Sequence, residues 1–355
     1  MIGLNTSALP VVINPGVWTM EASYYTDDLT LTEPWDWTTE ISNLSANLLP
    51  EDIFMYFTIP VFCFFGLVGN GILLWFLGFK IKRNKFTVYI LNLAISDFLI
   101  LLGRMVGLIL FALEFMIGSL YVPLNIFRIL SILYIFGYNT NQYLLTAISA
   151  ERCMSTLYPI WYHCWRPKHL SFILCAILWA LASVVSGLEY SICIDKSWSS
   201  ENLESYTMAF TSCQAVSLFI FILAFLVFMP IMVICSLTLL IQIWKRSQRR
   251  HSPKLYIIIV VTVFLFLICS TPFRILFFTK DYYNVDPSEL IILCFTLLST
   301  VSSCSNPLIY FFIGNHSRRR TTGSLKAVLE GVFKDEDQEI TAAPNICIQF
   351  DLGPK

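Results

Sequence analysis

The sequence predicts an all-α membrane protein, a seven-transmembrane helix bundle followed by a short amphipathic helix on the inner surface. The 355 residues are 56% hydrophobic and only 13% charged, whereas soluble domains carry about 25% charged residues. Seven apolar runs are long enough to cross about 30 Å of hydrocarbon at about 1.5 Å per residue. They fall near residues 54–79, 86–113, 122–155, 169–193, 211–244, 254–279 and 288–313.

The distribution of charge predicts the orientation of these spans. No Lys or Arg precedes Lys80, whereas residues 21–52 contain eight acids. Cytoplasmic loops of membrane proteins carry an excess of Lys and Arg. We therefore expect a multi-pass protein of the plasma membrane with its N-terminus outside the cell. The basic segments that we expect inside are residues 80–85, 166–168, 245–254 and 318–326.

Four parts follow from this topology: an extracellular tail (1–52), the bundle (53–314), the amphipathic helix (315–333) and a cytoplasmic tail (334–355). The outer tail contains the sequons Asn5-Thr6-Ser7 and Asn43-Leu44-Ser45, so Asn5 and Asn43 are expected to carry glycans. The segment 315–333 has basic residues first and apolar residues later, which suits a helix lying against membrane lipid.

Polar side chains in the second and third spans mark the centre of the predicted bundle. Asp97 lies in the middle of LNLAISDFLILLG, where a carboxyl group must face the bundle interior or water. Asn141 in the third span is an expected partner for it. Arg104 follows Asp97 by about two helical turns on the same face, and the sequence gives it no firm role beyond a place among the ligand-site candidates.

Residues near the outer ends of the spans form the candidate ligand site. Tyr134 and Tyr138 recur at helical spacing, a pattern that indicates either helix packing or ligand contact. Glu189 would attract cations if it lies in a cleft, or would simply mark the lipid–water boundary. Cys193 is one i+4 step beyond Glu189, and a bridge to Cys213 would tie the fourth and fifth spans above this carboxylate. Arg274 is a further candidate.

Two prolines predict movable parts in the sixth and seventh spans. Pro272 removes a backbone hydrogen bond and should kink the sixth helix. The pair Asn306-Pro307 should break the seventh helix locally, and Tyr310 follows one turn later.

An acid–base pair, Glu151-Arg152, stands where the third apolar run ends. A charged pair at that depth is costly and usually functional. The alternative is an arginine that snorkels to the membrane boundary.

Several function classes are disfavoured. The sequence contains no HExxH, no GxSxG and no metal-spaced His/Cys cluster, and the linking segments leave no room for an enzymatic domain, so we expect no enzyme. A transporter is disfavoured because no internal repeat is visible. Residues 288–313 lack a Lys for a retinal Schiff base, and Tyr134 stands where a monoamine receptor would need an acid. We expect no nucleic-acid partner.

Short motifs in a fixed order resemble the rhodopsin-like G-protein-coupled receptors. They are Asn70 after Gly69, LNLAISD, ERC, Trp179, Pro230, Pro272 and NPLIY. More narrowly, ERCMSTLYPIWYHCWRPKHLS and SNPLIYFFIG resemble the Mas-related receptor family, over about residues 54–333. The resemblance implies a receptor that binds an extracellular peptide or small amine and activates a heterotrimeric G protein of the Gq or Gi type.

Matched residue by residue, the resemblance assigns roles to the polar centre and the acid–base pair. Asp97, Asn141 and Asn306 match a sodium-binding cluster, and no other cofactor is implied. Arg152 matches the arginine that meets the G protein, with Glu151 restraining it at rest.

At the switch and the ligand site, Tyr310, beside Pro307, matches the tyrosine that swings inward on activation. Glu189, under a Cys193–Cys213 bridge, matches the cation-recognising acid of several Mas-related receptors.

Two departures from the family pattern affect the expected ligand and relay. Ser217 stands where some cation-sensing relatives have a second acid, and Ser270 replaces a toggle tryptophan, so the relay from ligand to core must differ. If Arg104 or Arg274 pairs with Glu189, that carboxylate would no longer attract cations. The alternative is therefore an orphan or constitutively active receptor with a non-cationic ligand, or, less favoured, a membrane transporter.

Overall fold

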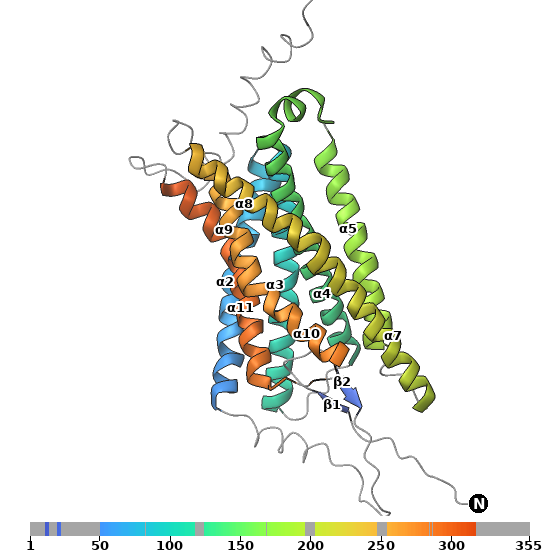
Figure 1. Ribbon diagram of the computed structural model, residues 1–355. Helices are drawn as coiled ribbons and strands as arrows, with labels where there is room; N and C mark the ends of the chain where they lie inside the picture. Colours follow the sequence, from blue (N-terminus) through green and yellow to red (C-terminus); the bar gives the residue numbers. More distant parts are fainter. Residues whose placement is uncertain are drawn as a thin grey trace, which may run out of the picture.

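The computed structural model describes residues 11–13, 20–22, 50–81, 83–117, 124–167, 169–195, 203–246, 254–283, 285 and 287–316. Within these ranges, long helices run side by side as a bundle (Figure 1). The predicted glycosylation sites Asn5 and Asn43, the tail 334–355 and the amphipathic helix beyond His316 lie outside the described residues.

The spans correspond closely to the predicted apolar runs, and several contain π-helical turns (η). The first three spans are α2 (Pro50–Trp75) with η1 (Phe76–Lys80), α3 (Lys85–Ile117) and α4 (Leu124–Leu157). The fourth is α5 (Leu170–Glu189) with η3 (Tyr190–Asp195), and the fifth is α7 (Leu203–Ile222), η4 (Leu223–Phe228) and α8 (Met229–Arg246). The sixth is α9 (Lys254–Leu265), η5 (Phe266–Ser270) and α10 (Thr271–Tyr283), and the seventh is α11 (Glu289–His316).

Two further elements lie at opposite ends of the bundle. A short turn, η2 (Trp161–Trp165), connects α4 to α5. An antiparallel hairpin of β1 (Val11–Ile13) and β2 (Met20–Ala22) lies at the other end of the bundle (Figure 1). The sequence did not predict this hairpin. We call the end of the bundle where α2 begins the cavity end, and the end that carries η2 the opposite end.

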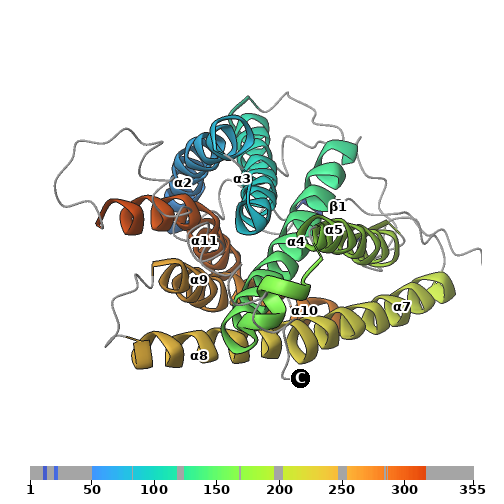
Figure 2. The same ribbon diagram turned by 90° about the horizontal axis from the view of Figure 1, so that it is seen from above.

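Six of the seven spans are long and apolar enough to cross a membrane, and α4 is the exception. This helix is 34 residues long, and it contacts α3, α5, α8 and α9. Viewed from above, it lies among the other helices (Figure 2). Polar side chains on α4 therefore meet protein and not lipid, which is where polar residues are tolerated in membrane bundles. The buried ones include Asn139, Thr140, Asn141, Gln142 and Thr146.

Small residues allow the close approach of neighbouring helices. A Cβ atom at Gly137 of α4 would lie 2.6 Å from Ile100 Cγ1 and 3.3 Å from the Ser96 carbonyl oxygen of α3. Between α2 and α11, Asn70 Nδ2 donates to the Ser303 carbonyl oxygen at 3.2 Å. These contacts fix α2, α3, α4 and α11 as one packed group.

The predicted kink at Pro272 and the predicted break at Asn306-Pro307 have different outcomes. Pro272 is the second residue of α10, which begins directly after the π-helical turn η5, and such turns and prolines are the usual causes of helix kinks. By contrast, α11 continues through Pro307 to His316, so the predicted break at Asn306-Pro307 is wrong as an interruption of the helix. Neighbouring helices can compensate for the lost backbone bond of a proline in a membrane bundle.

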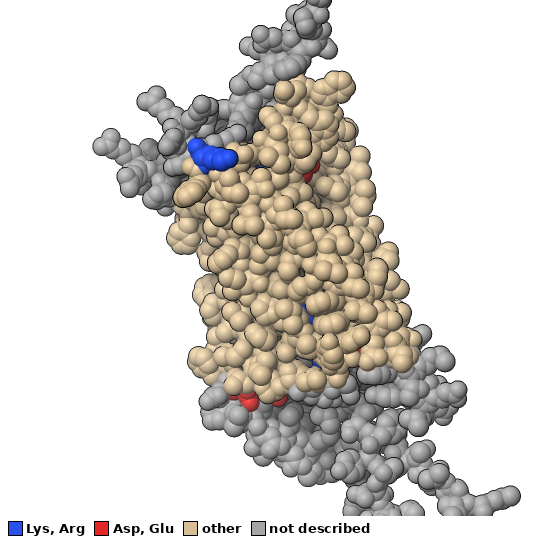
Figure 3. Space-filling view, in the orientation of Figure 1, with Lys and Arg blue, Asp and Glu red and all other residues tan. Residues whose placement is uncertain are grey.

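The surface agrees with a membrane protein. On the face shown in Figure 3, the most prominent blue patch (Lys, Arg) lies at the opposite end and the most prominent red patch (Asp, Glu) lies at the cavity end. The rest of the described surface in this view shows only small recessed spots of either colour. Large apolar side chains such as Phe65, Leu226 and Phe264 are more than half exposed there or elsewhere around the bundle. Such side chains need lipid as their solvent.

Candidate functional site

A cavity of about 640 Å³ opens at the cavity end between α4, α5, η3 and α10. This volume includes the open space at the mouth of the cavity. Most of its lining is apolar or aromatic, with a few charged groups. The lining residues are Ser131, Tyr134, Ile135, Tyr138, Glu189, Cys193, Phe273, Arg274, Phe277 and Asp281.

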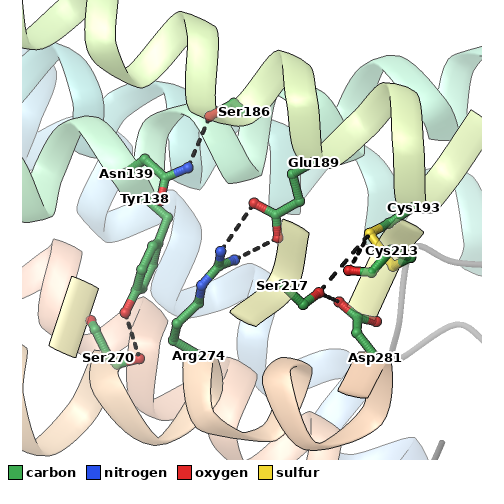
Figure 4. Close-up of polar contacts among 10 residues, drawn as sticks. All are labelled: Tyr138, Asn139, Ser186, Glu189, Cys193, Cys213, Ser217, Ser270, Arg274 and Asp281. Carbon is green, nitrogen blue, oxygen red and sulfur yellow. Dashed lines mark hydrogen bonds and ion pairs between the residues drawn. A yellow bond between two sulfur atoms is a disulfide. The ribbon is translucent and has the colours of Figure 1, made fainter. Parts of the chain in front are cut away.

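An ion pair between α5 and α10 crosses this cavity (Figure 4). Arg274 Nη1 donates to Glu189 Oε1 at 2.7 Å, and Nη2 donates to Oε2 at 3.1 Å. The side chains of Arg274 and Glu189 are only 12% and 8% exposed. This two-point geometry is the strong form of an arginine–carboxylate contact. It occupies both oxygens of the acid that sequence reasoning placed in the ligand site.

A second acid, Asp281, faces the same region from one end of α10 (Figure 4). Ser217 Oγ of α7 donates to Asp281 Oδ2 at 3.3 Å. Sequence reasoning chose Ser217 but missed Asp281. The sequence did contain an indication of Asp281, because it lies two helical turns after Arg274 and so shares one face of a helix with it.

The predicted disulfide between Cys193 and Cys213 is present and joins η3 to α7. It lies beside Asp281 and Ser217 at the rim of the cavity (Figure 4). The bridge therefore holds the cavity-end parts of the fourth and fifth spans beside these polar groups.

The two tyrosines predicted for the site both line the cavity. Tyr138 donates to the Ser270 carbonyl oxygen at 3.4 Å, next to Pro272. Tyr134 packs edge-on against Phe273, with 5.4 Å between ring centroids. Both tyrosines thus connect α4 to the sixth span near its kink.

Arg104 does not line the cavity, although it was a candidate for the ligand site. Its guanidinium carbon lies 4.5 Å from the centroid of the Tyr134 ring, and the residue is 2% exposed. It donates to the Thr296 carbonyl oxygen at 2.6 Å and to Thr300 Oγ1 at 2.7 Å. Arg104 therefore packs against the Tyr134 ring and links α3 to α11 through its hydrogen bonds.

The polar centre assembles as three side chains from three helices. Asp97 is fully buried, and Asn306 Nδ2 donates to its Oδ2 at 2.6 Å. Asn141 Nδ2 donates to Asp97 Oδ1, while Asn141 Oδ1 has no hydrogen-bond partner among the described residues. Carboxylate and amide oxygens are ligands for hard cations, so this donor set fits the sodium ion that the resemblance implies.

At the opposite end, Glu151 does not make the contact expected from the resemblance. Among the described residues it forms an ion pair with Arg166, whose Nη2 lies 2.8 Å from Oε1 and 2.9 Å from Oε2. Tyr89 and Tyr162 also donate to this carboxylate, at 3.2 and 3.3 Å. The expected restraint of Arg152 by Glu151 is therefore wrong for this structure, because the η2 segment brings a competing cation.

Arg152 instead lies over the ring of Phe86, with 4.3 Å between the guanidinium carbon and the ring centroid, and is 5% exposed. Tyr310 is 2% exposed and belongs to the same hydrophobic core as Phe86. Pro307 precedes it and lies close to Gly69 of α2. The candidate switch residues are thus held inside the bundle at this end.

Comparison with known proteins identifies relatives over most of the chain. The family model described as "7 transmembrane receptor (rhodopsin family)" matches residues 69–310. The chain is 46% identical to Proto-oncogene Mas of Rattus norvegicus over 280 residues, 77% of this chain and 81% of that protein. It is 43% identical to Mas-related G-protein coupled receptor member H of Rattus norvegicus over 294 residues, 82% and 86% of the two chains. It is 38% identical to member X1 of Homo sapiens over 284 residues, 77% and 81% of the two chains.

Proposed function

The chain belongs to the Mas-related group of the rhodopsin family of seven-transmembrane receptors, and we propose that an extracellular peptide or small amine drives it to activate a Gq- or Gi-type G protein. Membership of this family makes it a G-protein-coupled receptor of the cell surface and not an enzyme. The nature of the ligand and the class of G protein are the proposed parts.

The proposed orientation has the cavity end outside and the opposite end in the cytoplasm. The four basic segments and the acid-rich residues 21–52 support it through the charge bias of cytoplasmic loops. In this orientation the cavity is open to extracellular ligands and Arg152 lies on the G-protein side.

One observation carries the proposed mechanism, namely that a single kinked span reaches both sites. Its outer part, α10, supplies Phe273, Arg274 and Asp281 to the cavity. Its inner part, α9, contacts α4 next to the switch, where Thr156 Oγ1 and the Tyr256 hydroxyl are 3.5 Å apart. The π-helical turn η5 and Pro272, where a kink is expected, lie between the two parts.

A ligand that prefers one position of α10 would shift the position of α9. A ligand changes such an equilibrium only by its difference in affinity for the two states. The active state in this proposal has α9 displaced from α4 and Arg152 available to the G protein. Tyr138, bonded to the backbone at Ser270, takes the place of the absent toggle tryptophan as the contact between cavity and kink.

We also propose that Asp97 and the free amide oxygen of Asn141 hold a sodium ion in the resting receptor. A bound cation there would supply positive charge to a carboxylate that is fully buried. Asn306 keeps the carboxylate oriented by its hydrogen bond from α11.

The proposed function is tested with calcium and cyclic-AMP readouts in cells exposed to a panel of basic peptides, amines and neutral metabolites. Arg152→Ala should abolish every receptor-dependent response while surface expression persists. Arg83→Ala removes an exposed arginine at the same end and should leave the responses intact. Normal responses in the Arg152→Ala receptor would refute the assignment of the switch.

A further inference from the structure

We propose that Asp281 on α10, and not Glu189, is the carboxylate that binds the cationic group of the ligand. This inference rests on the proposed function, because it names the residue that selects the ligand in the same cavity. The ligand class that follows is an amine or guanidine whose basic group lies at the outer rim of the cavity.

The charge of Glu189 is already balanced in the resting structure. Arg274 contacts both of its carboxylate oxygens, at 2.7 and 3.1 Å. Breaking a buried ion pair leaves an uncompensated charge, which is strongly unfavourable. A ligand cation would have to replace Arg274 and leave that guanidinium unpaired, so the pair acts towards the ligand as a nearly neutral group.

Asp281, in contrast, has a neutral partner. Its Oδ2 accepts one hydrogen bond, from Ser217 Oγ at 3.3 Å. Its neighbour Lys280 forms no ion pair with it in the described part of the chain. A ligand cation can therefore pair with this carboxyl group without displacing an arginine or a lysine.

The position of Asp281 also favours contact with a ligand. It lines the main cavity and the smaller adjoining hollow of about 200 Å³. The small Ser217 side chain on α7 stands beside it and leaves space at the outer rim next to the carboxyl group. A basic group bound there would contact α10, which is the helix whose position the ligand changes in the proposed mechanism.

A second observation defines the inner end of the ligand. Tyr134 lines the same cavity and is 7% exposed, and its hydroxyl has no hydrogen-bond partner among the described residues. A buried hydroxyl without a partner costs about 1–3 kcal/mol, so a polar ligand group that reaches it would be favoured.

The helix geometry gives the distance between the two ends of the ligand. Tyr134 packs on Phe273, and Asp281 lies eight residues further along α10, which is about 12 Å at 1.5 Å per residue. Phe277 lines the cavity between these levels. The cavity thus fits a molecule with a basic group and a hydrogen-bonding group about 12 Å apart, joined by an apolar segment.

The test uses two probes of equal length, measured by thermal-shift titration of the purified receptor in lipid nanodiscs. One is an octyl chain with an amine at one end and a hydroxyl at the other, and the second is the neutral diol of the same chain. The wild-type receptor should bind the amino alcohol at least about tenfold more tightly than the diol, the expected size of a charge-assisted hydrogen bond. Asp281→Asn should abolish this preference, and Asp281→Glu should keep it.

A charge-matched variant separates Asp281 from Glu189. Glu189→Gln alone should weaken amine binding, because it leaves Arg274 as an unpaired positive charge. The double variant Glu189→Gln/Arg274→Gln removes the pair together and should restore the preference for the amine. If Glu189 were the ligand's partner, the double variant would not recover.

Two results would overturn the inference: no amine preference in the wild-type receptor, or a preference that survives Asp281→Asn but is lost in the double variant. Neither result would touch the proposed function, which is judged separately from the Arg152→Ala responses. Thermal unfolding of each variant without probe verifies that it is folded.

Discussion

Replacing Arg166 by Gln should lower basal G-protein activation, because it frees Glu151 to restrain Arg152. In the structure Arg166 is held by both oxygens of Glu151 and also donates to Ser171 Oγ at 2.6 Å. Its side chain is 0% exposed and that of Glu151 is 11% exposed, so the pair is shielded from water. The family restraint is therefore absent at rest, and removing the competing cation should create it.

The expected size follows from the contacts exchanged. A hydrogen bond to a charged group contributes about 1.5–3 kcal/mol, and Arg152 would give up a cation–π contact with Phe86 worth about 0.5–2 kcal/mol. A net gain of about 1 kcal/mol for the restrained state would lower the active population about fivefold. Tyr89 and Tyr162 still donate to Glu151, so the carboxylate does not lose all its partners.

The assay is ligand-free nucleotide exchange on the G protein at matched receptor density. Arg166→Lys keeps a cation beside Glu151 and should stay close to the wild-type rate. The double variant Arg166→Gln/Glu151→Gln should regain the activity lost in Arg166→Gln. A basal rate in Arg166→Gln equal to or above wild type would refute the reasoning.

Two further predictions concern the scaffold. Gly137→Ala places a methyl group 2.6 Å from Ile100 Cγ1 and should destabilise the receptor by about 1–3 kcal/mol, which lowers its thermal midpoint. At Gly187 the added methyl group would meet nothing within 4 Å beyond its own stretch of helix, so Gly187→Ala should not lower the midpoint. Cys193→Ser opens a disulfide that spans 20 residues. It should lower the free energy of unfolding by about 3 kcal/mol and should also weaken probe binding. Cys294→Ser, at a free thiol, should leave both quantities unchanged.

The spans could be predicted from the sequence because lipid imposes a simple requirement on them. A helix in hydrocarbon must satisfy its backbone internally and present apolar side chains, so each apolar run became a helix, or a chain of helical turns, close to its predicted limits. The π-helical turns and the continuous helix at Pro307 were not predictable in the same way. They depend on which neighbouring groups replace a backbone hydrogen bond, and that is known only once the helices are packed.

The polar centre was predictable as a set, whereas the pairing of charges was not. Asp97, Asn141 and Asn306 are polar groups at mid-membrane depth. Such groups face the bundle interior and form hydrogen bonds with one another. Glu151 had two possible cations, and Arg166 lies 15 residues away from it in the sequence. The choice between Arg152 and Arg166 was made by the path of η2, which carries no signal in hydropathy or spacing.

The acid of the ligand site shows how a position-by-position comparison can misplace a charge. The sequence offered Glu189 and found only Ser217 where relatives place a second acid, which suggested a cavity with a single carboxylate. In the folded chain Ser217 faces Asp281 from the opposite helix, so a second carboxyl group is present at the rim although its residue comes from α10. Asp281 follows Lys280 at the end of an apolar run, where an acid is ordinary for a membrane boundary. A ligand responds to the electrostatic potential inside the cavity, whichever helix carries the acidic residue. The cation preference of this receptor should therefore follow Asp281 even though Glu189 carries the resemblance to the family.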